Sequence, residues 1–344
     1  MGSTESLAAG HGRISARAPF HLEATVRVLQ RRPGNRVDAW EQGRYCRILD
    51  TAPGLAWIDV ENRGSIDRPD VRYAVRTTRL SSAHRARLEG TLRRVLGLDV
   101  DPAPLQRLAH AERRLRAAAH ALRGMRPPRF TGLFEAFANV VPFQQLSLDA
   151  GVAIIGRLVE RFGTPLEQDG RRLYAFPAAE TIAGTRVERL KQCGLSARKA
   201  ETLRFLAKTI ASGELSEQDF CGLSSADALR FLTELPGIGP WSASLVLLRG
   251  LGRLDVFPPG DVGAVAGLRA LMHLRAGASL ERVIERFGDY RGHLYFYALG
   301  GRLLAKGLIR TAGQRCQENA MQTRRPDARS DPFVVAREPR AARS

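Results

Sequence analysis

The chain has few cysteines and no long apolar run, and each shortage excludes a class of protein. Its four cysteines, Cys46, Cys193, Cys221 and Cys316, lie far apart, and no C-x-x-C pair occurs. Because zinc and iron–sulfur sites are built from closely spaced cysteines, we expect no metal site and only isolated, reduced thiols. No stretch approaches the roughly 18 consecutive apolar residues that a membrane-spanning helix needs.

The beginning of the chain also lacks a recognisable signal. Residues 1–17 contain no charged and then apolar segment of the secretory type, so we expect a disordered leader there. The expected location is the bacterial cytoplasm, in association with the nucleoid. With 344 residues, of which 44% are hydrophobic and 26% charged, the chain is long enough for two or three domains with a sizeable core.

Lysine is scarce, yet positive charge is abundant. Lysine occurs at four positions, Lys191, Lys199, Lys208 and Lys306, whereas lysine and arginine together number 53 against 35 acidic residues, a net charge of +18. A coding preference of the genome explains arginine in place of lysine, but it does not explain the excess over acid. Such an excess attracts polyanions, and it predicts a nucleic-acid partner rather than a merely basic surface.

Two apolar patterns divide the chain. Alternating residues in "LEATVRV" (22–28), "RYCRI" (44–48), "LAWIDV" (55–60) and "VRYAVRT" (71–77) predict antiparallel strands, and Ser81 or Ser82 is placed to cap a helix ending near Gly97. We therefore predict an α+β domain over 18–102. From 103 to 310 the spacing becomes helical and predicts an all-α bundle. The basic, polar residues 311–344 predict a disordered tail.

The stretch "ELPGIGPW" (234–241) predicts a tight hairpin between two helices. Without a Cβ, Gly237 and Gly239 permit a positive φ or a close backbone approach, so the amides entering the second helix can reach a phosphate oxygen. Ile238, between them, is suited to plug the hairpin into the core. The alternative is an ordinary helix corner with a glycine C-cap, for which one glycine would suffice.

A second candidate follows in "DVFPPGD" (255–261). Two prolines and a glycine force a turn, and Asp261 then stands where a helix N-cap belongs. A cap alone accounts for an isolated aspartate at such a position. Beside a hairpin that binds a nucleic-acid backbone, however, the same carboxylate would lie near the deformed nucleotide.

These motifs together resemble the helix-hairpin-helix (HhH-GPD) DNA glycosylase superfamily, and most closely the bacterial 3-methyladenine DNA glycosylase II group. Besides the hairpin and the "FPPGD" loop, "FEAFANVVPFQQLS" (134–147) is similar to the family's helix and DNA-probing loop. The stretches 194–207 and 287–299 are similar to the helix before the hairpin and to the closing helix. The resemblance covers roughly 19–308 and implies a TATA-binding-protein-like α+β domain, an antiparallel sheet with helices, followed by a mainly α-helical HhH-GPD bundle.

The resemblance implies a base-excision-repair enzyme that acts on double-stranded DNA containing damaged bases, as a monomer and without a cofactor. It would flip out an alkylated purine such as 3-methyladenine or 7-methylguanine and hydrolyse its N-glycosidic bond. Asp261 matches the catalytic carboxylate that stabilises positive charge developing on the sugar. Trp241 takes the place of the Schiff-base lysine of lyase-active relatives, which implies a monofunctional enzyme, since Lys208 and Lys306 lie outside both motifs.

The resemblance also assigns binding residues. Those expected to bind the substrate are Trp241, Gln144, Gln145, Leu245 and Tyr297. Those expected to bind the DNA backbone are Pro236, Gly237, Ile238, Gly239 and Ser242. No metal ligand is expected, and it is left open whether a monovalent cation sits at the hairpin carbonyls.

Several positions depart from the family pattern, and they leave the lesion spectrum open. Relatives often have aromatic residues where this chain has Leu245, Val262 and Leu299, and a small residue where it has Pro142-Phe143. Core packing is an alternative for Trp241 and Tyr297, and a capping or solvated side chain is one for Gln145. A non-catalytic hairpin DNA-binding protein and a glycosylase for other damaged bases are the alternative functions.

Overall fold

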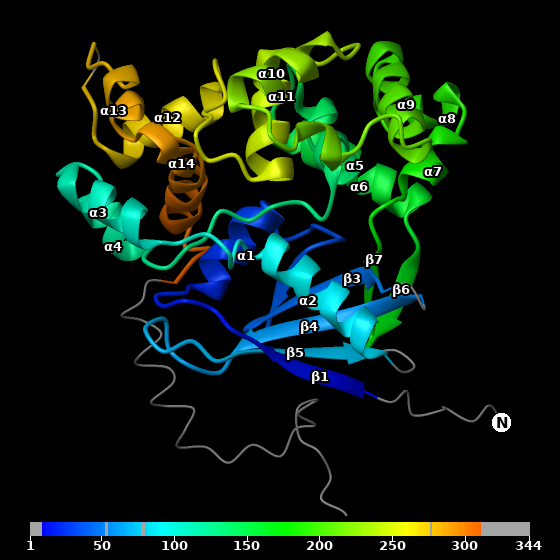
Figure 1. The fold of residues 1–344 in the computed structure, drawn as a ribbon, viewed down its shortest axis with the longest axis horizontal. Helices are drawn as coiled ribbons and strands as arrows, with labels where there is room; N and C mark the ends of the chain where they lie inside the picture. Colours follow the sequence, from blue (N-terminus) through cyan, green and yellow to red (C-terminus); the bar gives the residue numbers. More distant parts are fainter. Residues whose placement is uncertain (1–8, 52–53, 77–79, 276, 311–344) are drawn as a thin grey trace, which may run out of the picture.

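The computed structural model describes residues 9–51, 54–76, 80–275 and 277–310. An antiparallel sheet forms one side of the molecule and most of the helices form the other (Figure 1). One hydrophobic core runs from Ile14 in the sheet to Ile309 near the end of the last helix. The boundary predicted between 102 and 103 stays a prediction, because this core is continuous across it.

The sheet has five antiparallel strands in the order β1-β5-β4-β3-β2. The strands predicted at 44–48, 55–60 and 71–77 are confirmed, apart from Thr77, which lies outside the described residues. The strands are β1 (Ala9–Ile14), β2 (Ala39–Glu41), β3 (Arg44–Asp50), β4 (Leu55–Asn62) and β5 (Val71–Arg76).

Strand β1 corrects the prediction of a disordered leader over 1–17. Residues 9–14 pair with β5 along their whole length, from Ala9 opposite Arg76 to Ile14 opposite Val71. This segment, "AGHGRI", has one large apolar residue, so its own pattern gives no strand signal. Hydrogen bonding to the backbone of β5 therefore stabilises this strand, although its own sequence does not predict one. Residues 1–8, and the tail predicted at 311–344, lie outside the described part of the chain.

The strand predicted at 22–28 is wrong, because this segment forms helix α1 (Leu22–Gln30). His21 caps it, since its Nδ1 accepts a hydrogen bond from the amide of Ala24 at 3.2 Å. Helix α1 lies between the sheet and the helical region and contacts β2, β3 and α14 (Figure 1). Because α1 is buried on nearly every side, its apolar residues are not confined to one helical face, and the alternation of Leu22, Ala24, Val26 and Val28 imitated a strand.

The remaining helices follow the predicted periodicity. The predicted cap is confirmed, since Ser81 accepts from the amide of His84 at the start of α2. The longer helices are α2 (Ser82–Val95), α3 (Ala103–Ala111), α6 (Leu148–Phe162), α9 (Ala197–Ala211), α10 (Ser225–Glu234), α12 (Val262–Leu271) and α14 (Gly292–Ala305). The shorter ones are α4 (Arg116–Ala121), α5 (Leu133–Ala138), η1 (Val141–Phe143), α7 (Ala179–Ala183), α8 (Val187–Lys191), η2 (Glu217–Phe220), α11 (Pro240–Leu245), the π-helix η3 (Val246–Leu251), α13 (Glu281–Arg286) and η4 (Gly288–Tyr290).

A β-hairpin interrupts the region predicted to be all-α. Strands β6 (Pro165–Gln168) and β7 (Arg171–Tyr174) are joined by Asp169 and Gly170, both with positive φ, at 50° and 72°. An Asp-Gly pair of this kind favours a two-residue hairpin turn. Leu173 of β7 packs with Ile48 and Trp57 of the large sheet, so the hairpin connects the helical region to the sheet (Figure 1).

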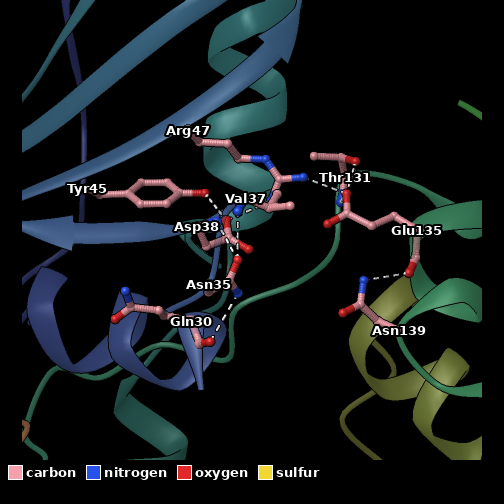
Figure 2. A network of polar contacts seen from close by, with 9 residues as sticks. All are labelled: Gln30, Asn35, Val37, Asp38, Tyr45, Arg47, Thr131, Glu135 and Asn139. Carbon is pink, nitrogen blue, oxygen red and sulfur yellow. Dashed lines mark hydrogen bonds and ion pairs between the residues drawn. The ribbon is translucent and has the colours of Figure 1, made fainter. Parts of the chain in front are cut away.

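A buried cluster of charges also joins the sheet to the helices (Figure 2). The guanidinium of Arg47 on β3 donates to Asp38 Oδ1 at 2.7 Å and to Glu135 Oε2 on α5 at 2.7 Å. The Tyr45 hydroxyl also donates to Asp38 Oδ1, at 2.7 Å. Burial acts to lower the pKa of Arg47, but the two carboxylates hold it well above its ordinary value. Arg47 therefore remains a cation shared between the two parts of the fold.

We expect Arg47→Met to destabilise the protein by about 3–5 kcal/mol, because it leaves two buried carboxylates without their cation. Arg172→Met is the matched control, since Arg172 and its partner Glu167 are 57% and 60% exposed. An exposed pair contributes at most about 1 kcal/mol. Urea unfolding of both variants measures the difference, and equal losses of stability would contradict this role of Arg47.

Candidate active site

The predicted hairpin is present between α10 and α11, at residues 235–239. Gly237 has φ +78°, and a Cβ there would fall on the side chain of Thr202, far inside van der Waals contact. Ile238, between the glycines, is 4% exposed and packs into the core, as predicted. Both the sign of φ and the space require glycine at 237.

Gly239 is the N-cap of α11, and unlike residue 237 this position does not require glycine for the fold. Its φ of −97° is open to any residue, and a Cβ there would meet nothing within 4 Å. No hydrogen bond to another described residue uses its amide. Nothing within the described fold requires glycine at 239, so the bare backbone there is free for close approach from outside.

Asp261 caps α12, and both of its carboxylate oxygens are engaged. Oδ1 accepts from the amide of Ala264 at 2.7 Å, and Oδ2 accepts from the indole Nε1 of Trp241 at 3.0 Å. The first bond is the helix cap that the sequence predicted. The second ties the carboxylate to α11, the helix that follows the hairpin, so the two motifs are joined directly.

Two cavities meet at Asp261. A groove of about 970 Å³ runs along the hairpin and is lined by Pro236, Gly237 and Gly239 among others. A pocket of about 630 Å³ lies on the other side, with a mainly apolar wall that includes Leu245 and Leu299. Asp261 and Trp241 line both cavities. Asp261 therefore lies where an extended ligand bound along the groove could place one of its groups in the pocket.

Both parts of the chain match known protein families. Residues 139–288 match the model of the HhH-GPD superfamily base excision DNA repair protein, and residues 12–131 match that of the AlkA N-terminal domain. A DNA-3-methyladenine glycosylase of Bacillus subtilis is 31% identical over 58% of this chain and 67% of its own length.

The chain belongs to the HhH-GPD superfamily.

More distant relatives extend the comparison. A probable bifunctional transcriptional activator/DNA repair enzyme of Mycobacterium tuberculosis is 29% identical over 73% of this chain, and the match spans about half, 49%, of that protein. The solved 3-methyladenine DNA glycosylase of Archaeoglobus fulgidus has a TM-score of 0.70 and 27% identity, over 86% of this chain and 98% of its own. The predicted fold class and the prediction of a DNA glycosylase of this superfamily are confirmed.

The glutamines of the probing loop have separate environments in this glycosylase. Gln144 Nε2 donates to the carbonyl of Gly237 at 2.8 Å and to Ser242 Oγ at 2.9 Å. Gln145 is exposed and has φ +55°. Gln144 therefore fastens the loop to the hairpin, and Gln145 is the one of the pair that faces solvent. Ser242, expected to bind DNA, is 2% exposed, and its hydroxyl accepts a hydrogen bond from Gln144.

Tyr297 was expected to bind the substrate, with core packing as the alternative. It is 4% exposed, belongs to the core and does not line the pocket. Tyr295 lines the pocket instead, together with Leu299 and Arg302 on the same face of α14. Tyr297 lies two positions from Tyr295, which is more than half a helical turn, so it points into the core. Leu245 does line the pocket, and its role stays a prediction.

Sequence reasoning missed three residues at the site. Leu146 is a large apolar residue, 43% exposed, beside both cavities. The ring of Phe143 also lines both cavities and lies where a Cβ on residue 151 would be, so Gly151 makes room for it. Arg31, at the end of α1, lines the pocket. Only Phe143 had a sequence signal, namely its size at a position where the family resemblance predicted a small residue.

Two lysines line the cavities, Lys199 in the groove and Lys306 in the pocket, although Lys306 lies outside both sequence motifs. Lys199 Nζ donates to the carbonyls of Pro142 at 3.1 Å and Gln144 at 2.6 Å, and burial lowers its pKa. These two hydrogen bonds attach the predicted probing loop to α9. Lys306 is exposed and lines the pocket. Neither stands at the position of Trp241 beside Asp261.

Cofactor sites can be assessed from the described residues. Within them no three His, Cys, Asp or Glu side chains gather as a metal site would require. A monovalent cation at the hairpin carbonyls stays a prediction, and one of these carbonyls, that of Gly237, already accepts from Gln144. No helix among the described residues has both the length and the apolar character to cross a membrane.

Replacing each of the two hairpin glycines by alanine should have different effects on the stability of the protein. We expect Gly237→Ala to lower the free energy of unfolding by about 1–3 kcal/mol, because of its positive φ and the collision with Thr202. Gly239→Ala should change it by no more than about 0.5 kcal/mol. Chemical unfolding of both variants tests this, and a Gly239→Ala variant as unstable as Gly237→Ala would show that residue 239 is also required by the fold.

Proposed function

We propose that this glycosylase is monofunctional and hydrolyses the N-glycosidic bond of alkylated purines in double-stranded DNA after rotating the nucleotide out of the duplex. The position of Asp261, in the wall common to the groove and the pocket, supports this proposal most strongly. A DNA backbone along the groove would bring the sugar of an extruded nucleotide to the carboxylate, with its base in the pocket.

The groove has the chemistry to bind a DNA backbone. Gly239 offers an unobstructed amide at the N-terminus of α11, where a phosphate is favoured. Arg198 and Lys199 on α9 add positive charge to the same groove. These groups bind phosphates irrespective of sequence, which suits an enzyme that searches for damage.

Leu146 has the position of a wedge. Apolar side chains inserted between base steps unstack the duplex and kink it. Leu146 is exposed at the edge of both cavities, and Gln144 and Lys199 fix the loop that carries it. We infer that Leu146 fills the space that the extruded base leaves.

Asp261 would act on the sugar. As the base departs, positive charge develops on the sugar, and a nearby carboxylate stabilises it and orients the attacking water. The hydrogen bonds from Ala264 and Trp241 hold this carboxylate in one orientation. Trp241 lines the pocket and supplies an aromatic surface for the base.

We expect Asp261→Asn to lower the rate of base release from methylated DNA by a factor of roughly 10² or more, with DNA binding kept. Asparagine caps helices as well as aspartate, so the fold should survive. Asp227→Asn, which removes a surface carboxylate paired with Arg230 on α10, is the control and should keep full activity. Release at the wild-type rate by Asp261→Asn would refute the mechanism. Binding without release by the wild type would indicate a non-catalytic protein.

A monofunctional enzyme should form no Schiff base. With Trp241 where a lyase has its lysine, we expect borohydride to trap no covalent complex with a lesion-containing duplex. Lys306→Gln is the comparison variant, because Lys306 is the lysine that lines the pocket. A trapped complex in the wild type that is lost in Lys306→Gln would assign lyase activity to Lys306.

A further inference from the structure

Arg31 is a cation in the wall of the apolar pocket. It ends α1 in a left-handed conformation, with φ +63°, and its side chain lines the pocket with Asp261 and Tyr295. Its guanidinium makes no hydrogen bond or ion pair to any other described residue. The next residue contrasts with it, since Arg32 donates to Asp149 at 2.6 Å.

Aromatic rings support the Arg31 guanidinium. Its central carbon lies 4.7 Å from the ring centroid of Phe143 and 5.9 Å from that of Phe130. Stacking on a ring uses the face of the planar group and leaves its N–H edges free to donate. Burial lowers the pKa of Arg31, whereas Tyr295, Asp261 and Asp38 act to raise it, and arginine keeps its charge at neutral pH. The pocket therefore contains a positioned donor with a positive charge.

A second guanidinium lies near the ring of Phe130. Arg249 is fully buried, and its central carbon lies 4.5 Å from the ring centroid of Phe130. Burial, and then the charge of Arg31, lower the pKa of Arg249 to about 9. Asp38 and Tyr295 act in the opposite direction. Negative charge added to the pocket next to Arg31 is therefore favoured, and added positive charge there is not.

This electrostatic field distinguishes two kinds of lesion. A purine alkylated at N3 or N7 is cationic while attached and departs as a neutral molecule, so it needs no donor. An uncharged damaged base departs with the electron pair of the broken bond and becomes an anion. A cation next to such a leaving group stabilises the transition state.

We propose that Arg31 is the specificity-determining residue of this site, donating an N–H to the carbonyl edge of an extruded, uncharged base and stabilising that base as it leaves. The proposal rests on the proposed function. In the step, the C1′–N bond breaks and its electron pair goes to the base, where Arg31 shares the charge. Water adds to C1′ near Asp261 and loses a proton, and the base anion takes up a proton from solvent.

Two duplexes test this, one with 7-methylguanine, which is cationic, and one with hypoxanthine, which is uncharged and has a carbonyl. The full chain and its variants are compared by single-turnover release. We expect Arg31→Gln to lower release of hypoxanthine by about 10²-fold. Release of 7-methylguanine should stay the same or rise, because a repelling charge is lost. Arg31→Lys, which keeps the charge, should recover part of the hypoxanthine activity.

Arg32→Gln is the matched control, since it removes the same charge from the adjacent position but from a group already paired with Asp149. It should not change the ratio of the two rates. Equal losses on both duplexes in Arg31→Gln, or no loss on hypoxanthine, would overturn the role of Arg31. So would a wild type that releases 7-methylguanine but no hypoxanthine. A wild type that releases neither would instead refute the proposed function. Retained release of 7-methylguanine shows that a variant is folded.

Discussion

The guanidinium of Arg47, shared between Asp38 and Glu135, is the interaction on which the rest of the structure depends. Asp38 belongs to the segment after α1, and Glu135 belongs to α5, so the cation fixes these two elements relative to the sheet. The same elements reach the pocket, through Arg31 at the end of α1 and Asn139 after α5. A buried ion pair with good geometry favours one arrangement over others, and here that arrangement sets two walls of the pocket.

The carboxylate of Asp261 depends on contacts of shorter range. Asp261 is held by the first turn of its own helix and by Trp241 from the hairpin helix. Gln144 and Lys199 connect the probing loop to the hairpin and to α9 in a similar way. The loop, the hairpin and the carboxylate are thus positioned by direct hydrogen bonds between them.

The pocket is lined by charges of both signs, and in the proposed reaction each sign has a different role. In the proposed reaction Asp261 stands where positive charge develops on the sugar, whereas Arg31, with Arg249 near it, favours negative charge on the base. In that reaction the electrons of the glycosidic bond move from the sugar to the base, that is, away from Asp261 and toward Arg31. The Arg31 guanidinium stacks on the ring of Phe143, which gives an aromatic residue at position 143 a role in this pocket.

The sequence alone determined the features that arise from neighbouring residues. These are the hairpin with Ile238 in the core, the cap at Asp261, the helical periodicity, and three strands of the sheet. Each depends on propensities and hydrogen bonds that act over a few positions. The family resemblance then singled out Asp261 as the expected catalytic carboxylate.

Only the tertiary structure decided features that depend on distant segments. Whether 22–28 forms a strand or a helix was settled by its burial between the sheet and α14, and β1 by its pairing with β5. The choice of Tyr295 over Tyr297 followed from the rotation of α14 against the core. Arg31 has no local signal at all, because its surroundings come from segments more than a hundred residues away, which meet only when the core has packed.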